Sequence, residues 1–180
     1  DVACARLLIA CGARVNLADN QGRTPLLKAS SVGADACVDL LLERDANPCH
    51  ADEDGNTPVQ EAWEGGHVHC AHVLLHHGGD PNAKLSSGLT ILHDASACGD
   101  ATTVRMLLEH DSYPSMTSAG RSPLAASIRH RHADVTKLLL EHGANLFQAD
   151  FRGETPLRLL TKAPKHFVAE VMLQYLNAVQ

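Results

Sequence analysis

The chain has 180 residues, of which 44% are hydrophobic, 20% are charged and 3% are aromatic, and its formal net charge is -6. No run approaches the roughly 18 consecutive apolar residues of a membrane span, and no signal-peptide pattern opens the chain. The negative charge and the scarcity of aromatic rings argue against phosphate-backbone and base-stacking surfaces, so we expect an intracellular protein, cytoplasmic or nuclear, that binds neither nucleic acid nor a membrane.

Five short blocks recur along the chain. They are GRTPL at Gly22, GNTPV at Gly55, GLTIL at Gly88, GRSPL at Gly120 and GETPL at Gly153, spaced by 33, 33, 32 and 33 residues. Each block except the last is followed by a leucine-rich segment that closes on a turn, and the opening segment CARLLIACGARVN matches the same second half. A period of this length indicates stacked supersecondary units.

Each block except GLTIL contains the predicted start of a first helix. A proline fits the first helical turn, where a missing N–H costs nothing, and the Thr or Ser before it fits the capping position. The predicted starts are Pro25, Pro58, Pro123 and Pro156, capped by Thr24, Thr57, Ser122 and Thr155. Residues 40–42, 73–75, 106–108 and 138–140 are expected to form the apolar stripe of the second helices.

The turns after the second helices differ in their residues. Gly12, Gly78 and Gly143 suit the left-handed residue that ends a helix, whereas Asp45 and Asp111 take this place at a cost of up to about 1 kcal/mol. We therefore expect looser turns at the two aspartates.

These blocks and their spacing resemble the ankyrin repeat, a β-turn followed by two antiparallel helices. The resemblance spans essentially the whole chain and implies an all-α ankyrin-repeat solenoid of about five to six stacked repeats, in a single domain over residues 1–180. The expected divisions are a partial repeat at 1–18, full repeats at 19–51, 52–84, 85–116 and 117–149, and a divergent terminal repeat at 150–180. Because residue 1 falls just before a second helix, we expect a monomeric excerpt of a longer chain.

Three of the six cysteines follow the period. Cys4, Cys37 and Cys70 are spaced by 33 residues and are predicted at one buried second-helix position. Neighbouring repeats place such atoms about 8 to 10 Å apart, beyond the reach of a disulfide, so we expect free thiols in a reducing compartment.

The segment HVHCAHVLLHH, residues 67–77, holds five histidines and one cysteine. In the register of a second helix, His69, His72 and His76 share one exposed stripe, while Cys70 points inward. Imidazoles at this spacing chelate zinc or nickel, but no carboxylate or thiolate completes a tetrahedral site. We expect a solvated or adventitiously metal-binding stripe and no resident cofactor, with a physiological metal site as the alternative.

No catalytic motif is found. The chain has no phosphate-cradling glycine loop, and a solenoid provides little of the pocket that a Cys or His nucleophile needs, so we expect no catalytic residues and no enzyme activity. The resemblance implies a non-enzymatic scaffold that binds a protein or peptide partner on a concave groove. The alternatives are the substrate-recognition module of a ubiquitin-ligase adaptor of the SOCS-box type and a metal-responsive regulator that uses the histidine stripe.

The resemblance also implies where a partner would bind. Contacts in such arrays come from turn tips and first-helix ends. The third repeat is acidic here and the fifth is basic, which predicts a partner with a matching bipolar strip. Trp63 is either an anchor in the groove or packs between repeats. The predicted contact residues are Arg23, Glu53, Asp54, Asn56, Trp63, Glu64, Leu89, Arg121, Arg129, His130, Phe151 and Arg152.

Two further features come from the family pattern. The histidine of its Thr-Pro-Leu-His motif remains only as His93, so we expect lower stability than in consensus arrays. Asn16 and Asn82 resemble the family's asparaginyl-hydroxylation acceptors, and modification there would be incidental to binding.

Overall fold

The computed structural model describes residues 1–118, 120–169 and 171. Over these residues all regular structure is helical, apart from the isolated β-bridges Lys84–Thr90 and Ser118–Arg121, which confirms the predicted all-α class. In the described part, no helix is both long enough and apolar enough to cross a membrane. The chain divides into two compact units, Asp1–Ala83 (unit 1) and Lys84–Gln180 (unit 2).

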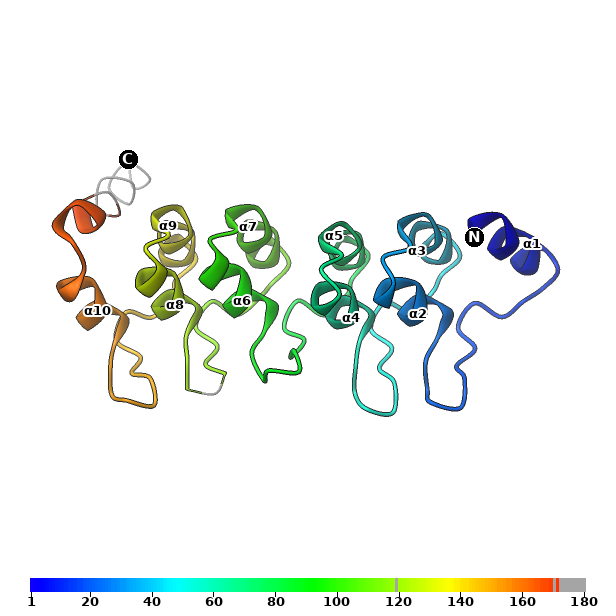
Figure 1. Cartoon of the computed structure of the whole chain (residues 1–180), viewed down its shortest axis with the longest axis horizontal. Coiled ribbons are helices and arrows are strands. Elements are labelled where there is room, and N and C mark those ends of the chain that lie inside the picture. Colours follow the sequence, from blue (N-terminus) through cyan, green and yellow to red (C-terminus); the bar gives the residue numbers. More distant parts are fainter. Residues whose placement is uncertain (119, 170, 172–180) are drawn as a thin grey trace. The chain divides into compact units, whose positions relative to one another are not determined.

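Unit 1 consists of helices stacked in two layers (Figure 1). One layer holds α2 (Pro25–Ser31) against α4 (Pro58–Glu64), and the other holds α1 (Val2–Ala10), α3 (Asp35–Leu42) and α5 (Val68–His76). The pairs α2–α3 and α4–α5 join the two layers. The turns before α2 and α4 extend beyond the first layer, where their tips are exposed.

Unit 2 repeats this arrangement (Figure 1). Its first layer holds α6 (Ile91–Cys98), α8 (Pro123–His130) and α10 (Pro156–Lys162), and its second holds α7 (Ala101–Glu109) and α9 (Ala133–Glu141). Residues 165–169 are also helical. The rest of the predicted terminal repeat, residues 170 and 172–180, lies outside the described residues except for Val171.

The predicted helix starts are confirmed. In α2 the hydroxyl of Thr24 accepts a hydrogen bond from Leu27 N at 3.3 Å, with Pro25 as the first helical residue. The other three predicted caps make the same bond: Thr57 to Gln60 N at 3.3 Å, Ser122 to Ala125 N at 3.1 Å and Thr155 to Arg158 N at 3.2 Å. α6, whose block lacks the proline, is instead capped by Thr90 together with His93.

The apolar stripe of the second helices forms the core. Leu40, Leu74, Leu107 and Leu139 are each at most 1% exposed, and the neighbouring predicted positions are buried or half-buried. Helix α1 differs, because it packs mainly on α3 and none of its residues is buried. Leu7 and Leu8 of this helix are exposed to solvent.

The left-handed turn residues are also as predicted. Gly12, Gly78 and Gly143 have positive φ, and Asp45 and Asp111 adopt the same conformation with φ of 59° and 61°. The structure adds a third case that the sequence analysis did not identify, because Arg131 ends α8 with φ of 62°.

The predicted burial of the periodic cysteines is correct only for Cys70, which is 0% exposed. Cys37 is half-buried and Cys4 is exposed, because Cys4 lies on the thinly covered helix α1. The Cys70 thiol donates to Asp35 Oδ1 at 2.8 Å, and burial raises its pKa to about 12. Cys70 therefore stays protonated and unreactive.

Candidate functional site

An open groove of about 310 Å³ lies in unit 2. It is formed by α6, by α8 and by the turns that precede α6, α8 and α10, and we call it the α6–α8 groove. The residues that line it are Leu89, His93, Asp94, Ala97, Arg121, Ser122, Ala126, Arg129, His130, Phe151 and Arg152.

The α6–α8 groove collects every contact residue that the sequence analysis predicted for unit 2. They come from three consecutive repeats, and they meet because α6, α8 and α10 pack side by side and carry equivalent positions next to one another. The six residues are Leu89, Arg121, Arg129, His130, Phe151 and Arg152.

One wall of the groove combines an aromatic ring with a cation. Phe151 is 61% exposed, and the guanidinium carbon of Arg152 lies 5.1 Å from the centroid of its ring. Such a cation–π contact contributes about 0.5–1 kcal/mol at an exposed site and holds the guanidinium in place. Among the described residues, no carboxylate pairs with the side chain of Arg152 or Arg121.

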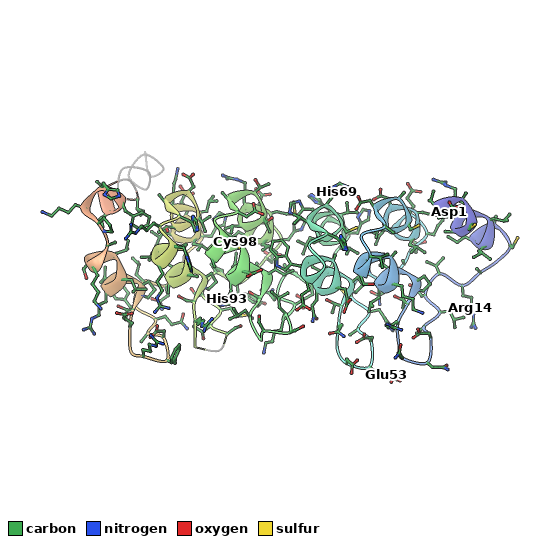
Figure 2. All side chains as sticks on the ribbon, in the orientation of Figure 1. Asp1, Arg14, Glu53, His69, His93 and Cys98 are labelled. Atoms are coloured by element: carbon green, nitrogen blue, oxygen red, sulfur yellow. The ribbon has the colours of Figure 1, made fainter. Side chains whose placement is uncertain are left out.

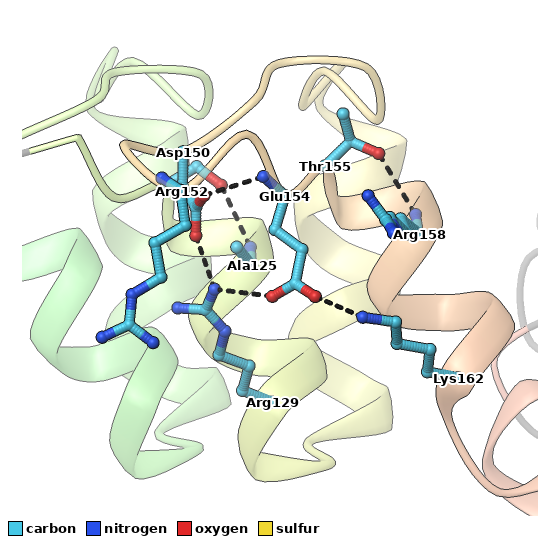
Figure 3. A network of polar contacts seen from close by, with 9 residues as sticks. Ala125, Arg129, Asp150, Arg152, Glu154, Thr155, Arg158 and Lys162 are labelled. Atoms are coloured by element: carbon cyan, nitrogen blue, oxygen red, sulfur yellow. Dashed lines mark hydrogen bonds and ion pairs between the residues drawn. The ribbon is translucent and has the colours of Figure 1, made fainter.

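Arg129, in contrast, is held by two carboxylates (Figure 3). Its Nη2 lies 2.6 Å from Asp150 Oδ2 and 3.4 Å from Glu154 Oε2, and Lys162 Nζ lies 2.5 Å from Glu154 Oε1. The Asp150 side chain is only 2% exposed. Arg129 therefore shapes the groove, but its charge is neutralised locally.

The carboxylates of this network are stabilised in their charged form. The backbone N–H of Glu154, bonded to Asp150 Oδ1 at 2.9 Å, lowers the pKa of Asp150, and the Arg129 guanidinium lowers it further. The ammonium of Lys162 likewise holds the pKa of Glu154 below its usual value. The network thus stays ionised at neutral pH.

His93 positions the turn that carries Arg121. Its ring is 2% exposed, with Nε2 3.0 Å from Arg121 O and Nδ1 2.8 Å from Thr90 Oγ1. Because a carbonyl oxygen only accepts hydrogen bonds, Nε2 carries the proton and Nδ1 is the acceptor. Burial lowers the pKa of His93, which favours this neutral form.

A close backbone approach positions the turn of Phe151. Phe151 N donates to Gly120 O at 3.2 Å, and a Cβ added at Gly120 would lie 2.9 Å from Phe151 Cβ. Gly120 also has φ of 66°, a conformation that other residues rarely adopt. The glycine of one repeat therefore lets the next turn tip approach the groove.

A second, smaller groove of about 140 Å³ lies in unit 1 between α2 and α4. Arg23, Asp54 and Asn56 of the predicted set line this α2–α4 groove. Its other lining residues are Gln21, Leu27, Lys28, Ser31, Asp52 and Glu61.

Charges in the α2–α4 groove are partly paired. Lys28 Nζ lies 2.6 Å from Asp19 Oδ2, and this contact, with backbone N–H groups, holds the pKa of Asp19 far below its usual range. Burial raises the pKa of Glu61, and the nearby carboxylates of Asp52 and Glu64 raise it further. Asp19 thus engages Lys28, and it lies 3.7 Å from Arg23 Nε as well.

Three predicted contact residues of unit 1 do not line this groove. Glu53 is exposed at the tip of the turn before α4 (Figure 2). Glu64 is exposed at the end of α4. Trp63 lies half-buried on α4. Their role in binding stays a prediction.

The histidine stripe lies on α5, and His69 and Glu53 occupy opposite edges of unit 1 (Figure 2). His69 and His76 are exposed and His72 is half-buried. Throughout the described residues, no group of three His, Cys, Asp or Glu side chains is placed to hold a metal ion.

The two predicted hydroxylation acceptors occupy turns of unit 1. Asn16 Nδ2 donates to Asp45 O at 3.0 Å, and Asn16 Oδ1 accepts from Asn47 N at 2.8 Å. Asn82 is half-buried, and its backbone N–H donates to Asp80 Oδ1 at 2.9 Å. Asn16 therefore ties its own turn to that of the next repeat.

Sequence reasoning missed a set of aspartates that shape the turn tips. Asp19, Asp52 and Asp150 each accept two backbone N–H bonds through one carboxylate oxygen. The signal was available, because each of them stands three residues before a block glycine.

Comparisons with known proteins agree with this architecture. A family model for ankyrin repeats, in three copies, matches residues 1–85, 36–118 and 92–178. The chain is similar to the crystal structure of an ankyrin repeat domain from Acinetobacter baumannii, with a TM-score of 0.80 and 24% identity over 99% of this chain and 92% of that one. This likeness shows the fold. No curated protein matches the chain.

Proposed function

The chain belongs to the ankyrin-repeat family, and we propose that it is a non-enzymatic interaction module that binds a partner polypeptide in the α6–α8 groove. Repeats of this family generally serve as protein–protein interaction modules. The observation that carries the proposal is that all six contact residues predicted for unit 2 line this one groove.

The side chains of the groove suit a polypeptide interface. Most binding energy in such interfaces comes from a few aromatic and arginine anchors surrounded by groups that exclude water. Phe151, Arg152 and Arg121 supply such anchors, and Leu89 and Ala97 supply apolar surface beside them. His93 and Gly120 hold the turn tips that carry these anchors. Binding therefore costs less conformational entropy.

The α2–α4 groove supports a second contact of the opposite charge. Asp52, Asp54 and Glu61 line it, while Lys28 is held by Asp19. We propose that this groove contacts a basic segment of a partner. Charge complementarity of this kind sets association rate and orientation more than affinity.

Site-specific photo-crosslinking in cells tests the groove. We would replace Phe151 or Leu89 with p-benzoylphenylalanine and place the same residue at Glu109, which is exposed at the end of α7 and does not line the groove. We expect a cross-linked polypeptide from positions 151 and 89 and not from position 109. No cross-link at 151 and 89, or equal yields at all three positions, would overturn the proposal.

A further inference from the structure

We propose that the α6–α8 groove selects an acidic peptide segment in which Asp or Glu stands next to apolar side chains. This inference rests on the proposed function, because it names the chemistry of the partner at the same groove. It follows from two guanidinium groups that no described carboxylate pairs with, from the fixed backbone that carries them and from the apolar side chains that line the same groove.

The charge of the groove is positive after its internal pairs are counted. Its ionised lining residues are Arg121, Arg129, Arg152 and Asp94. Arg129 is neutralised by Asp150, so Arg121 and Arg152 outnumber the one carboxylate of the lining, Asp94. Among the described residues, no carboxylate pairs with the guanidinium of Arg121 or Arg152.

Guanidinium groups favour carboxylates because the planar fork of N–H donors matches two carboxylate oxygens. The backbone that carries both groups is fixed before a ligand arrives. Arg121 O is bonded by His93 Nε2 at 3.0 Å, and Arg152 N donates to Asp150 Oδ1 at 2.8 Å. Arg152 is further held against the Phe151 ring. Binding a carboxylate here therefore requires little reorganisation.

Apolar side chains also line the groove, so charge alone would not fill it. Phe151 is 61% exposed, and Leu89, Ala97 and Ala126 line the same opening. A peptide side chain that covers this surface gains the free energy of removing it from water. The partner segment therefore needs apolar residues beside its carboxylates.

Panning a phage-displayed library of random peptides against the intact chain tests this inference. We expect the enriched peptides to carry Asp or Glu next to Leu, Ile, Phe or Val. A synthetic copy of an enriched peptide, measured by fluorescence anisotropy, should bind more weakly when its Asp and Glu are replaced by Asn and Gln. Its affinity should also fall as ionic strength rises.

Two double variants of the protein, one inside the groove and one outside it, test whether the position of the reversed charges matters. Arg121→Glu with Arg152→Glu should weaken binding of the enriched peptide at least about tenfold. Arg105→Glu with Arg158→Glu makes the same change in net charge at exposed positions of unit 2 outside the groove, and should change affinity less than about twofold. Circular dichroism and thermal melting would establish that both double variants are folded.

The outcomes separate this inference from the proposed function. Enriched peptides without acidic residues, equal losses in the two double variants, or no enriched peptide would overturn the inference. In each of these cases a cross-link from position 151 would leave the proposed function standing. Absence of both the enriched peptides and the cross-link would overturn the two together.

Discussion

Asp45, Asp111 and Arg131 occupy backbone positions that glycine takes in neighbouring repeats. All three have positive φ, between 59° and 62°. The two aspartates could be predicted, because they interrupt a series of glycines at the ends of the second helices. Arg131 interrupts a similar series, Gly33, Gly66 and Gly99, which lies between the first and second helices.

Replacing these residues by glycine should therefore stabilise the protein. Asp111→Gly and Arg131→Gly should each raise the free energy of unfolding in urea by up to about 1 kcal/mol, because glycine reaches the left-handed region without a steric penalty. Arg105→Gly, at an exposed position inside α7, should instead lower it by about 1 kcal/mol. A loss of stability in Asp111→Gly or Arg131→Gly would mean that the side chain itself supports the turn.

His93 makes stability depend on pH. Burial lowers the pKa of the folded ring below the value of 6.5 that applies to an exposed histidine, and Nδ1 must stay unprotonated to accept from Thr90. As pH falls below about 6.5 the unfolded chain takes up this proton before the folded chain does, so the free energy of unfolding decreases. Above that pH, His93 makes its full contribution to the free energy of unfolding.

Urea unfolding at a series of pH values measures this effect. Between neutral pH and about pH 5, the free energy of unfolding should decrease less in His93→Gln than in the parent chain, because the variant lacks the titrating ring. His130→Gln, which changes an exposed histidine of the same groove, serves as the control variant. Identical pH profiles for His93→Gln and the parent would contradict the role assigned to the buried ring.

At the scale of the elements, the turn tips are built in two ways. Asp19, Asp52 and Asp150 bond two backbone N–H groups and close their turns, as Asx turns do. The turns before α6 and α8 lack this aspartate, and each contains an isolated β-bridge, Lys84–Thr90 or Ser118–Arg121. The turns that carry Arg121 and Arg152 are therefore closed by different bonds.

Removing Asp150 should destabilise unit 2 in two ways, because it caps a turn and holds Arg129. Asp150→Ala should lower the urea midpoint more than Asp52→Ala, since Asp52 caps its own turn but makes no ion pair within 4.0 Å in the described part of the chain. The difference in urea midpoint between the two variants should be smaller at high salt, because Arg129 is 36% exposed and salt partly screens its attraction to Asp150. Equal midpoints for the two variants would show that the ion pair adds nothing.

At the scale of the whole molecule, the period of the sequence predicted the helix starts and the buried stripe, and the family resemblance implied six contact residues that share one groove. These features depend on position within a repeat, and position can be read from spacing. The pairing of Arg129 with Asp150 and Glu154 could not be predicted, because it depends on which side-chain conformers meet between neighbouring repeats. The same limit applies to Cys4, whose burial depends on what covers α1.

This pairing changes where the charge of the fifth repeat lies. The sequence analysis predicted a basic fifth repeat, and Arg121, Arg129 and His130 are its basic contact residues, with Arg152 beyond. Within the described part of the chain, Arg129 is held by carboxylates, whereas no carboxylate pairs with Arg121 or Arg152. Partner selection in unit 2 should therefore respond to changes at Arg121 and Arg152 more than to changes at Arg129.

Hydrogen–deuterium exchange on the chain, alone and with the polypeptide captured by cross-linking, tests the binding of a partner in the α6–α8 groove most directly. Slower exchange is expected in α6, in α8 and in the turns around residues 121 and 151, with little change in α7 and α9. Protection confined to α7 and α9, with unchanged exchange in those two turns, would contradict binding at this groove.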